Sequence, residues 1–248
     1  MTNIALIGYG KMGKIIRKLA EEKGHTIKVV IDPNCENTIK DITAEALEGV
    51  DVCIDFTHPS VIMDNIRKIA SFGKNIVIGT TGWYDQMDEV KKIVEEAGIG
   101  LIWSGNFSIG VNAFFRIVEN ASKTFNNLDS YDAMVHEFHH NQKADSPSGT
   151  ASMIGKIVVE NLDRKDKIVE DRLARKIEPN ELHLSSTRGG SIPGTHSVIF
   201  DSLQDTIELK HTARGREGFA TGAVLAAEFI NDKKGFFSIN DLMDDIIK

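Results

Sequence analysis

The strongest constraint on the fold of this 248-residue chain lies near its amino-terminal end. A short apolar run, Ile4–Ile7, leads directly into Gly8-Tyr9-Gly10-Lys11-Met12-Gly13, and an amphipathic run to about Lys23 follows. Glycines spaced as GxGxxG can mark an ordinary βα turn. Between a strand and a helix they also give a tight turn, a close backbone approach to a pyrophosphate and close helix packing. The helix start then favours phosphates. We therefore expect a Rossmann-type dinucleotide-binding domain.

Asp32 indicates which nucleotide this domain prefers. It ends the next predicted strand, Thr26–Ile31, and lies 19 residues beyond Gly13. A carboxylate there can accept hydrogen bonds from the adenosine ribose hydroxyls, and it repels a 2′-phosphate. The next residues supply no arginine, although Lys11 inside the loop could partly compensate. We expect NADH to be preferred and NADPH to be tolerated.

The amino-terminal part of the chain alternates short apolar runs with helical patterns. This alternation is typical of βαβ units around a parallel sheet. The strands of such a sheet are buried on both faces and are apolar throughout. The predicted strands are Ile4–Ile7, Thr26–Ile31, Val52–Phe56, Ile76–Gly79 and Ile99–Trp103. Helices are predicted up to about Lys23 and over Val61–Phe72 and Asp85–Ala97.

The pattern changes after about Asn106, where alternating or β-branched runs fit antiparallel strands. These runs are Asp132–Phe138, Glu181–Arg188, His196–Asp201 and Thr206–His211, with helices predicted over Gly110–Phe125, Thr150–Asn161, Gly218–Asn231 and Asn240–Ile247. We therefore predict an α/β protein. Residues 1–106 form the dinucleotide-binding domain, and residues 107–217 form an α+β substrate-binding and oligomerisation domain with a mostly antiparallel sheet. The segment 218–248 is expected to return to the first domain.

The composition restricts the functional classes. The formal net charge is −7, whereas a general nucleic-acid binder is expected to present a basic face. Apolar runs are too short for a transmembrane helix, and the amino-terminal run does not fit a signal peptide. Cys35 and Cys53 form no CxxC pair and fit a reducing cytoplasm. We expect a cytoplasmic protein without nucleic-acid or membrane partners, in which a local cluster of donors must attract any anionic substrate.

The run His136-Glu137-Phe138-His139-His140 matches the HExxH pattern of zinc metalloproteases. That chemistry needs a helix, because both histidines must share one face to chelate one metal. The local sequence from Asp132 reads as a strand, loop-forming residues follow at once, and no third ligand is evident nearby. We therefore expect no metal site. A zinc hydrolase is the alternative that stoichiometric zinc in the purified protein would support.

The same stretch holds side chains suited to proton transfer. If the strand ends near Phe138, then His139, His140 and Lys143 enter a loop over the nicotinamide. Histidine exchanges protons near neutral pH, and lysine can pair with a carboxylate or protonate a nitrogen. Pro147-Ser148-Gly149-Thr150 then opens a helix, with Ser148 as its N-cap and backbone N–H groups suited to a carboxylate. The cluster indicates a reductase with an anionic substrate, although a surface histidine cluster is an alternative for any single residue.

The segment Glu137–Ala151 resembles the signature of a known enzyme family. Its pattern, E-x-H-x3-K-x-D-x-P-S-G-T-A, is similar to that of dihydrodipicolinate reductase, also called 4-hydroxy-tetrahydrodipicolinate reductase, of bacterial lysine and diaminopimelate synthesis. Further segments resemble the family in order along nearly the whole chain: Asp55–Pro59, Gly79–Gly82, Ser104–Asn112, Arg188–Gly190, Gly194–His196 and Arg214–Ala220. The chain departs from the pattern at Thr195, where glutamate is common, and at Ser104-Gly105, where an Ala/Pro pair is more usual.

The resemblance implies NAD(P)H-dependent reduction of a cyclic dicarboxylate imine, in which the 4-hydroxyl is lost as water and hydride arrives at ring carbon 4. His139 would be the proton donor and acceptor, and Lys143 the proton donor at the ring-nitrogen side. The substrate would be bound by His140, Ser148, Gly149 and Thr150. NADH or NADPH would contact Gly8, Tyr9, Gly10, Lys11, Met12, Gly13, Asp32, Gly79, Thr80, Thr81, Ser104, Gly105, Asn106 and Phe107. Family members are generally homotetramers built through the carboxyl-terminal sheet, so a homotetramer is expected.

Two further functional classes fit the nucleotide fold. A redox-sensing regulator would need a partner or DNA surface, and the sequence contains no evident helix-turn-helix pattern or basic stretch. Another amino-acid or sugar dehydrogenase is also consistent with the architecture, because a fold alone does not fix a function. The segment Lys143–Thr150 argues against such another dehydrogenase.

Overall fold

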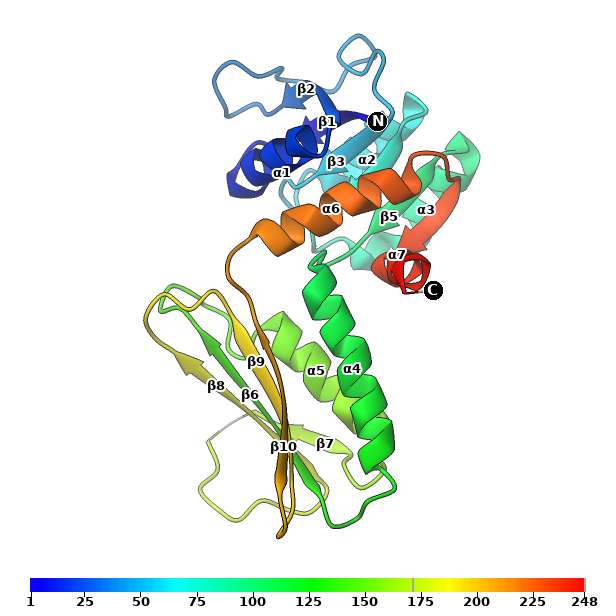
Figure 1. The fold of residues 1–248 in the computed structure, drawn as a ribbon. Helices are drawn as coiled ribbons and strands as arrows, with labels where there is room; N and C mark the ends of the chain where they lie inside the picture. Colours follow the sequence, from blue (N-terminus) through cyan, green and yellow to red (C-terminus); the bar gives the residue numbers. More distant parts are fainter. Residues whose placement is uncertain (171, 248) are drawn as a thin grey trace. The chain divides into compact units, whose positions relative to one another are not determined.

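The computed structural model describes residues 1–170 and 172–247, which form two compact units (Figure 1). Unit 1 contains residues 1–112 and the described residues from 216 onward, and unit 2 contains residues 113–215. The chain enters unit 2 within helix α4 (Ile109–Phe125) and returns to unit 1 just before helix α6 (Glu217–Ile230). No helix in the described ranges is long and apolar enough to cross a membrane.

Unit 1 is built around a six-stranded parallel sheet in the order β11-β5-β4-β3-β1-β2. The predicted Rossmann-type architecture is thereby confirmed. A sixth strand that the sequence analysis does not predict, β11, pairs with β5; only two of its residues, Phe236 and Phe237, are large and apolar. The strands are β1 (Asn3–Ile7), β2 (Thr26–Ile31), β3 (Val52–Asp55), β4 (Asn75–Ile78), β5 (Gly100–Trp103) and β11 (Gly235–Ser238).

Helices cover both faces of this sheet because the strand residues of both faces are apolar. Ala5 and Ile7 belong to the core that includes α2 (Ile62–Ser71) and α3 (Met87–Ala97). The intervening residues Ile4 and Leu6 are equally buried. They point to the other face, since successive side chains of a strand alternate.

On that other face, α1 (Lys11–Glu22) and α6 pack against each other and against the strands. The strand order reverses between β1 and β3. In open α/β sheets, ligands bind beside the carboxyl ends of the strands at such a reversal. After β11 the short helix α7 (Ile239–Ile246) completes the unit.

Unit 2 contains a five-stranded sheet in the order β10-β9-β6-β8-β7. The predicted α+β class is confirmed, but the sheet is mixed rather than mostly antiparallel: β6 and β9, and β9 and β10, are antiparallel, while β8 runs parallel to both β6 and β7. An alternating sequence does not distinguish the two pairings, because both have a side-chain period of two. The strands are β6 (Asp132–His139), β7 (Lys167–Val169), β8 (Glu181–Arg188), β9 (Thr195–Asp201) and β10 (Thr206–Thr212).

One face of this sheet is covered by α5 (Gly149–Glu160) and by the part of α4 that belongs to unit 2. The β6 residues that face these helices are all buried, but their character changes along the strand. Ala133 and Val135 are apolar, whereas Glu137 and His139 are ionisable. The apolar end of the row belongs to the core, and the polar end forms the candidate site.

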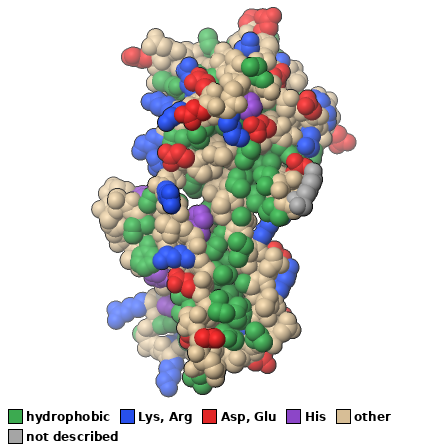
Figure 2. Space-filling model, in the orientation of Figure 1, with side chains coloured by type: hydrophobic (Ala, Val, Ile, Leu, Met, Phe, Trp, Pro, Cys, Tyr) green, Lys and Arg blue, Asp and Glu red, His purple; other side chains and the backbone are tan. Residues whose placement is uncertain are grey.

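One face of the molecule carries charged side chains of both signs. Figure 2 shows acidic and basic side chains interspersed over the face in view, without a continuous basic tract among the residues drawn there. This face therefore does not present the basic footprint of a nucleic-acid-binding protein.

Candidate functional site

The glycine loop joins β1 to α1, and two of its glycines are required by the protein itself. A Cβ on Gly8 would lie 2.7 Å from the Phe56 carbonyl oxygen, and one on Gly13 would lie 2.4 Å from the Gly8 carbonyl oxygen. Gly10 is different, because a Cβ there would meet no heavy atom within 4 Å. Its φ of −74° is also accessible to other residues. The open space beside Gly10 would allow a ligand to approach the backbone closely.

The start of α1 suits a phosphate group. Gly10 is the N-cap and has no side chain to occupy the helix amides, and the next amides belong to Lys11, Met12 and Gly13. The first hydrogen bond within the helix is the one from Lys14 N to Gly10 O, at 3.2 Å. The amides of a first helical turn have no partner within the helix and carry the positive end of its dipole. Together with the space beside Gly10, this loop fits the pyrophosphate of a dinucleotide.

The Asp32 carboxylate follows β2 and contacts the glycine loop directly. Its Oδ2 accepts a hydrogen bond from Tyr9 N at 2.7 Å, and its Oδ1 accepts one from Asn34 N at 2.8 Å. Each carboxylate oxygen can accept more than one hydrogen bond. Asp32 can therefore hold the loop and still accept a hydrogen bond from a ribose hydroxyl. The position of Asp32 in the sequence predicts a role at the ribose, but not its contact with Tyr9.

The fully buried Asp55, at the end of β3, organises the segment Gly79–Thr81 after β4. Its Oδ1 accepts hydrogen bonds from Thr57 N at 3.0 Å, Thr57 Oγ1 at 2.7 Å and Thr80 Oγ1 at 3.0 Å. Its Oδ2 accepts one from Asn65 Nδ2 at 2.9 Å. Burial raises the pKa of Asp55, and these hydrogen bonds oppose the rise. Asp55 belongs to one of the segments that resemble the family, and the sequence alone indicates no role for it.

The segment Ser104–Phe107 follows β5 and is held by local hydrogen bonds. Ser104 Oγ donates to Asn106 O at 2.8 Å and accepts from Asn106 N at 2.9 Å. Phe107 is buried, and a Cβ on Gly222 of α6 would lie 1.7 Å from the Phe107 carbonyl oxygen. Helix α6 thus shapes this segment. The four groups of residues predicted to contact the nucleotide follow β1, β2, β4 and β5, at the carboxyl edge of one parallel sheet.

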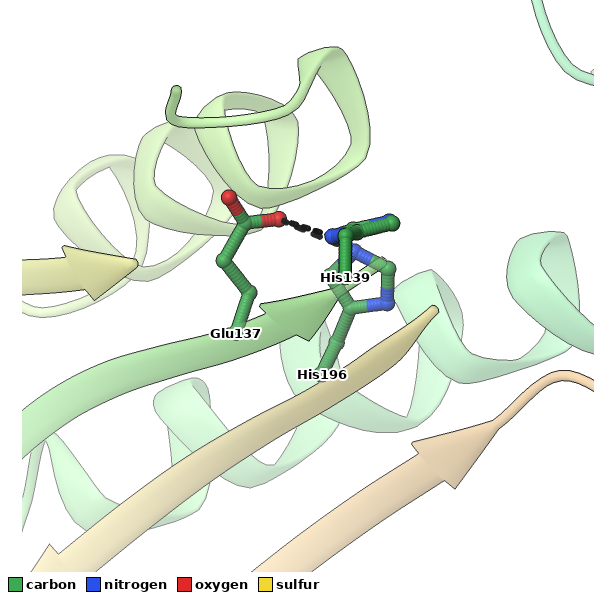
Figure 3. A group of neighbouring side chains, drawn as sticks. All are labelled: Glu137, His139 and His196. Atoms are coloured by element: carbon green, nitrogen blue, oxygen red, sulfur yellow. Dashed lines mark ion pairs between the residues drawn. The ribbon is translucent and has the colours of Figure 1, made fainter. Parts of the chain in front are cut away.

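In unit 2 the strand register gathers the ionisable side chains. Glu137 of β6 lies opposite His196 of β9 and Ser186 of β8, and His139 lies opposite Arg188 of β8. Opposed residues of neighbouring strands share a face of the sheet, and Figure 3 shows the two histidines beside the Glu137 carboxylate. Glu137 Oε2 is 3.1 Å from His139 Nδ1 and 3.6 Å from His196 Nε2.

Glu137 is a buried carboxylate that remains ionised. Its Oε1 accepts hydrogen bonds from Ser148 N at 2.9 Å, Ser186 Oγ at 2.8 Å and Arg188 Nη2 at 2.8 Å. Its Oε2 accepts one from Ser148 Oγ. Burial alone would raise the pKa of Glu137, but the hydrogen bonds from Ser148, Arg188 and Ser186 outweigh burial and lower it to about 2. The site therefore contains a fixed negative charge at neutral pH.

His139 is the last residue of β6 rather than the first of the following loop, and it is buried. Burial lowers its pKa; the Glu137 charge opposes that effect, while the Lys143 and Arg188 cations add to it. The ring nitrogen that Glu137 does not contact, Nε2, lies beside Gly194. A Cβ at that position would be only 2.9 Å from Nε2. Glycine therefore leaves room around the nitrogen that is available for proton exchange.

His140 and Lys143 lie in the loop after β6. His140 N donates to Ile192 O at 2.8 Å, and Lys143 N donates to His140 O at 3.2 Å, which closes the turn. Lys143 Nζ pairs with Asp145 Oδ1 at 2.8 Å, and its side chain remains 23% exposed. The ammonium group is thus partly accessible at the end of β6, beside an exposed carboxylate.

Helix α5 begins at Gly149, and its predicted N-cap is confirmed because Ser148 Oγ accepts a hydrogen bond from Ala151 N at 3.2 Å. Ser148 also donates both its N–H and its Oγ–H to Glu137. Its side chain is therefore buried at the helix start. The next amides of the first turn belong to Gly149 and Thr150, at the positive end of the helix dipole, where a carboxylate is favoured.

The HExxH run lies on strand β6, as predicted, so His136 and Glu137 point to opposite faces of the sheet. The structure instead brings together Glu137, His139 and His196, whose polar atoms all lie within 4.8 Å of one another. Both Glu137 oxygens already accept hydrogen bonds, and the Arg188 guanidinium contacts one of them. A cation at that position opposes a divalent metal. The arrangement around these three residues therefore does not favour a metal site.

Arg188, Gly194 and His196 belong to segments that resemble the family, but the sequence alone indicates no role for them. Arg188 and Glu137 are 51 residues apart in the chain and meet only through the register of β6 and β8. One signal could have indicated such a site. Glu137 and His139 occupy the same face of the predicted strand as the apolar Ala133 and Val135, and buried ionisable groups require partners.

Comparison with known proteins shows which family the sequence is similar to. Residues 2–107 match the family model described as dihydrodipicolinate reductase, N-terminus, and residues 110–243 match that described as its C-terminus. A 4-hydroxy-tetrahydrodipicolinate reductase of Christiangramia forsetii is 36% identical over 247 residues, covering 99% of both chains. One of Methanococcus vannielii is 33% identical over 270 residues, covering 98% of this chain and 99% of the relative.

A solved structure shares the fold. The dipicolinate-bound dihydrodipicolinate reductase from Paenisporosarcina sp. TG-14 superposes with a TM-score of 0.79 at 21% sequence identity. The match covers 97% of this chain and 99% of that chain. The architecture of both units is therefore that of a known reductase structure.

Proposed function

This chain belongs to the dihydrodipicolinate reductase family and is an oxidoreductase, and we propose that it reduces 4-hydroxy-tetrahydrodipicolinate to tetrahydrodipicolinate with a nicotinamide nucleotide. This is a step of lysine and diaminopimelate biosynthesis. The observation that carries the proposal is the arrangement in unit 2, where one buried carboxylate contacts both a histidine and the start of a helix suited to a carboxylate.

The reaction requires a proton in addition to the hydride, because the 4-hydroxyl group leaves the ring as water. When bound, the reduced nicotinamide supplies the hydride. His139 is suited to hold and release the proton: the Glu137 charge stabilises the protonated ring, and Nε2 lies beside the space that Gly194 leaves. Lys143 is assigned the proton at the ring-nitrogen side, since its ammonium is partly exposed at the end of β6.

The substrate carries two carboxylates, so a protein with a net charge of −7 must attract it locally. We assign this task to Lys143, His140 and the amides of Gly149 and Thr150 at the start of α5. Ser148 contributes by fixing that start, because its own polar groups are directed to Glu137 and to the helix cap. A substrate carboxylate would compete with Asp145 for the Lys143 ammonium.

The glycine loop, Asp32, Gly79–Thr81 and Ser104–Phe107 are assigned to the nucleotide. The strongest support is Gly10, for which the protein itself gives no packing reason. NADH is the preferred donor and NADPH the poorer one, because the Asp32 carboxylate favours a ribose hydroxyl over a 2′-phosphate. The homotetramer and the cytoplasmic location stay predictions of the sequence and of its resemblance to the family.

Steady-state assays with freshly generated 4-hydroxy-tetrahydrodipicolinate test this function. We expect the protein to oxidise both nucleotides only when the substrate is present, with the higher kcat/KM for NADH. Binding of NADH without turnover would contradict the proposed activity. A higher kcat/KM for NADPH would contradict only the role given to Asp32, and reactions without substrate are the control.

A further inference from the structure

One buried side chain, Glu137, connects two parts of the unit 2 site to which the proposed function gives separate tasks. Its Oε2 lies 3.1 Å from Nδ1 of His139, the proton-transfer residue. Its Oε1 accepts the N–H of Ser148, the residue that caps the substrate-binding helix start. The side chain of Glu137 has no exposed surface. It therefore acts on the reaction only through its neighbours.

The carboxylate is itself held rigidly. Oε1 accepts three hydrogen bonds, from Ser148 N, Ser186 Oγ and Arg188 Nη2, at 2.8 to 2.9 Å. Rotation of the carboxylate about its last bond would break these contacts. Oε2 is consequently directed toward the two histidines, as Figure 3 shows. A group fixed in this way can define the orientation of a neighbouring ring.

We propose that Glu137 is a positioning residue of the reduction, which holds His139 with Nδ1 protonated and Nε2 toward Gly194, and anchors Ser148 at the start of α5. The inference rests on the proposed function. A carboxylate beside one ring nitrogen selects the tautomer of a histidine and leaves the other nitrogen for chemistry. The Nδ1 to Oε2 contact is close but not aligned as a hydrogen bond, and catalytic hydrogen bonds commonly align when substrate binds.

The charges around His139 predict how removal of Glu137 would be detected. The groups that face His139 are Glu137 on β6, Lys143 and Asp145 in the next loop, Arg188 on β8 and His196 on β9, with His211 of β10 behind His196. Without the Glu137 charge, the Lys143 and Arg188 cations act on a buried ring with only the exposed Asp145 in opposition. The protonated form of His139 then becomes less stable, so its pKa falls further.

The experiment compares the wild type with Glu137→Gln, Glu137→Asp and a matched control, Glu181→Gln. Glu181 begins β8 in the same sheet and is also buried, but its carboxylate pairs with Lys167 at 2.8 Å and Arg175 at 2.7 Å. Histidine NMR titrations, assigned with His139→Asn, give the pKa of His139 without any need for turnover. Steady-state kinetics give kcat, the KM for substrate and the pH dependence of kcat/KM.

We expect Glu137→Gln to lower kcat about 100-fold, to raise the KM for substrate, and to lower the pKa of His139. The alkaline limb of the pH profile, where the proton donor loses its proton, should move to lower pH with it. Glu137→Asp should recover part of kcat and most of the pKa. Glu181→Gln should leave the His139 titration and kcat unchanged, even if it unfolds at lower temperature.

An unchanged His139 pKa in Glu137→Gln would overturn the proposal, as would an equal shift in Glu181→Gln. If Glu137→Gln does not fold, an unchanged pKa in Glu137→Asp overturns it. Absence of turnover in the wild type would refute the proposed function instead, while the titrations would still decide whether the Glu137 charge acts on His139.

Discussion

Asp55 in unit 1 and Glu137 in unit 2 are both buried carboxylates near the carboxyl end of a strand, but their partners differ in charge. Asp55 accepts hydrogen bonds from neutral donors of Thr57, Thr80 and Asn65. Glu137 accepts neutral donors and also the guanidinium of Arg188. Burial raises the pKa of Asp55, whereas hydrogen bonds that include the Arg188 cation lower that of Glu137 to about 2.

This difference in the charge of their partners matches the task proposed for each unit. Neutral donors are sufficient for Asp55, because its contacts order the backbone around a bound nucleotide and require no permanent charge. Glu137 lies beside a histidine that must gain and lose a proton, so its own charge has to remain constant while His139 titrates. The partly buried counterion Arg188 keeps it constant.

Removal of Arg188, the counterion of Glu137, should have the largest effect on the free energy of unfolding. Arg188→Met leaves the Glu137 charge buried and unpaired, and we expect it to lower the free energy of unfolding by about 3 kcal/mol at pH 7, as measured by urea denaturation. The control Arg175→Met removes an exposed partner of Glu181 and should cost less than about 1 kcal/mol. Equal losses in the two variants would contradict the special status of the Arg188 contact.

The pH dependence of that variant follows from the sign of the shift. The folded-state pKa of Glu137, about 2, is below its ordinary value of 4.5. The carboxylate therefore stabilises the fold above pH 4.5, and this stabilisation is lost as the pH falls toward 2. In Arg188→Met the pKa of Glu137 rises, so its contribution to this acid-dependent loss should shrink. A loss as steep as in the wild type would show that Arg188 does not set the pKa.

Asp55→Asn should have a smaller effect with the opposite dependence on pH. The amide keeps an acceptor oxygen but turns a donor toward Asn65 Nδ2, and we expect a loss of about 1–2 kcal/mol near pH 4. Because the folded-state pKa of Asp55 is raised above 3.8, the wild type loses stability as the pH rises through that range, whereas the variant does not. The difference between them should therefore narrow with rising pH. A difference that widens would show that the neutral donors alone keep Asp55 ionised.

The fold of unit 1 is largely predictable from sequence because its strands are continuous apolar runs and its glycine loop has one common geometry. The predicted Thr26–Ile31 agrees with β2, and the other predicted strands of this sheet differ from the observed ones by a residue or less at each end. The strand β11 is not predictable in this way, because two phenylalanines do not make a strand pattern. It exists because the edge of β5 offers it backbone partners.

The site in unit 2 is less predictable for a different reason. His139, Lys143 and Ser148 belong to one dense segment and can be found by inspection. Arg188, Gly194 and His196 reach that segment only through the pairing of β6 with β8 and β9, and register is a tertiary property. The same limit explains why the sequence predicts a mostly antiparallel sheet in unit 2, since the alternating sequence of β8 does not reveal that it runs parallel to β6.

The division of tasks between the units is tested most directly by one stopped-flow experiment on Lys143→Ala, in which NADH fluorescence reports first binding and then oxidation. Lys143 belongs to unit 2, whereas the residues assigned to the nucleotide belong to unit 1. We expect the Kd for NADH to stay within about twofold of the wild-type value and the rate of oxidation to fall at least about 100-fold. A variant that loses NADH affinity, or that oxidises NADH at the wild-type rate, would contradict this division.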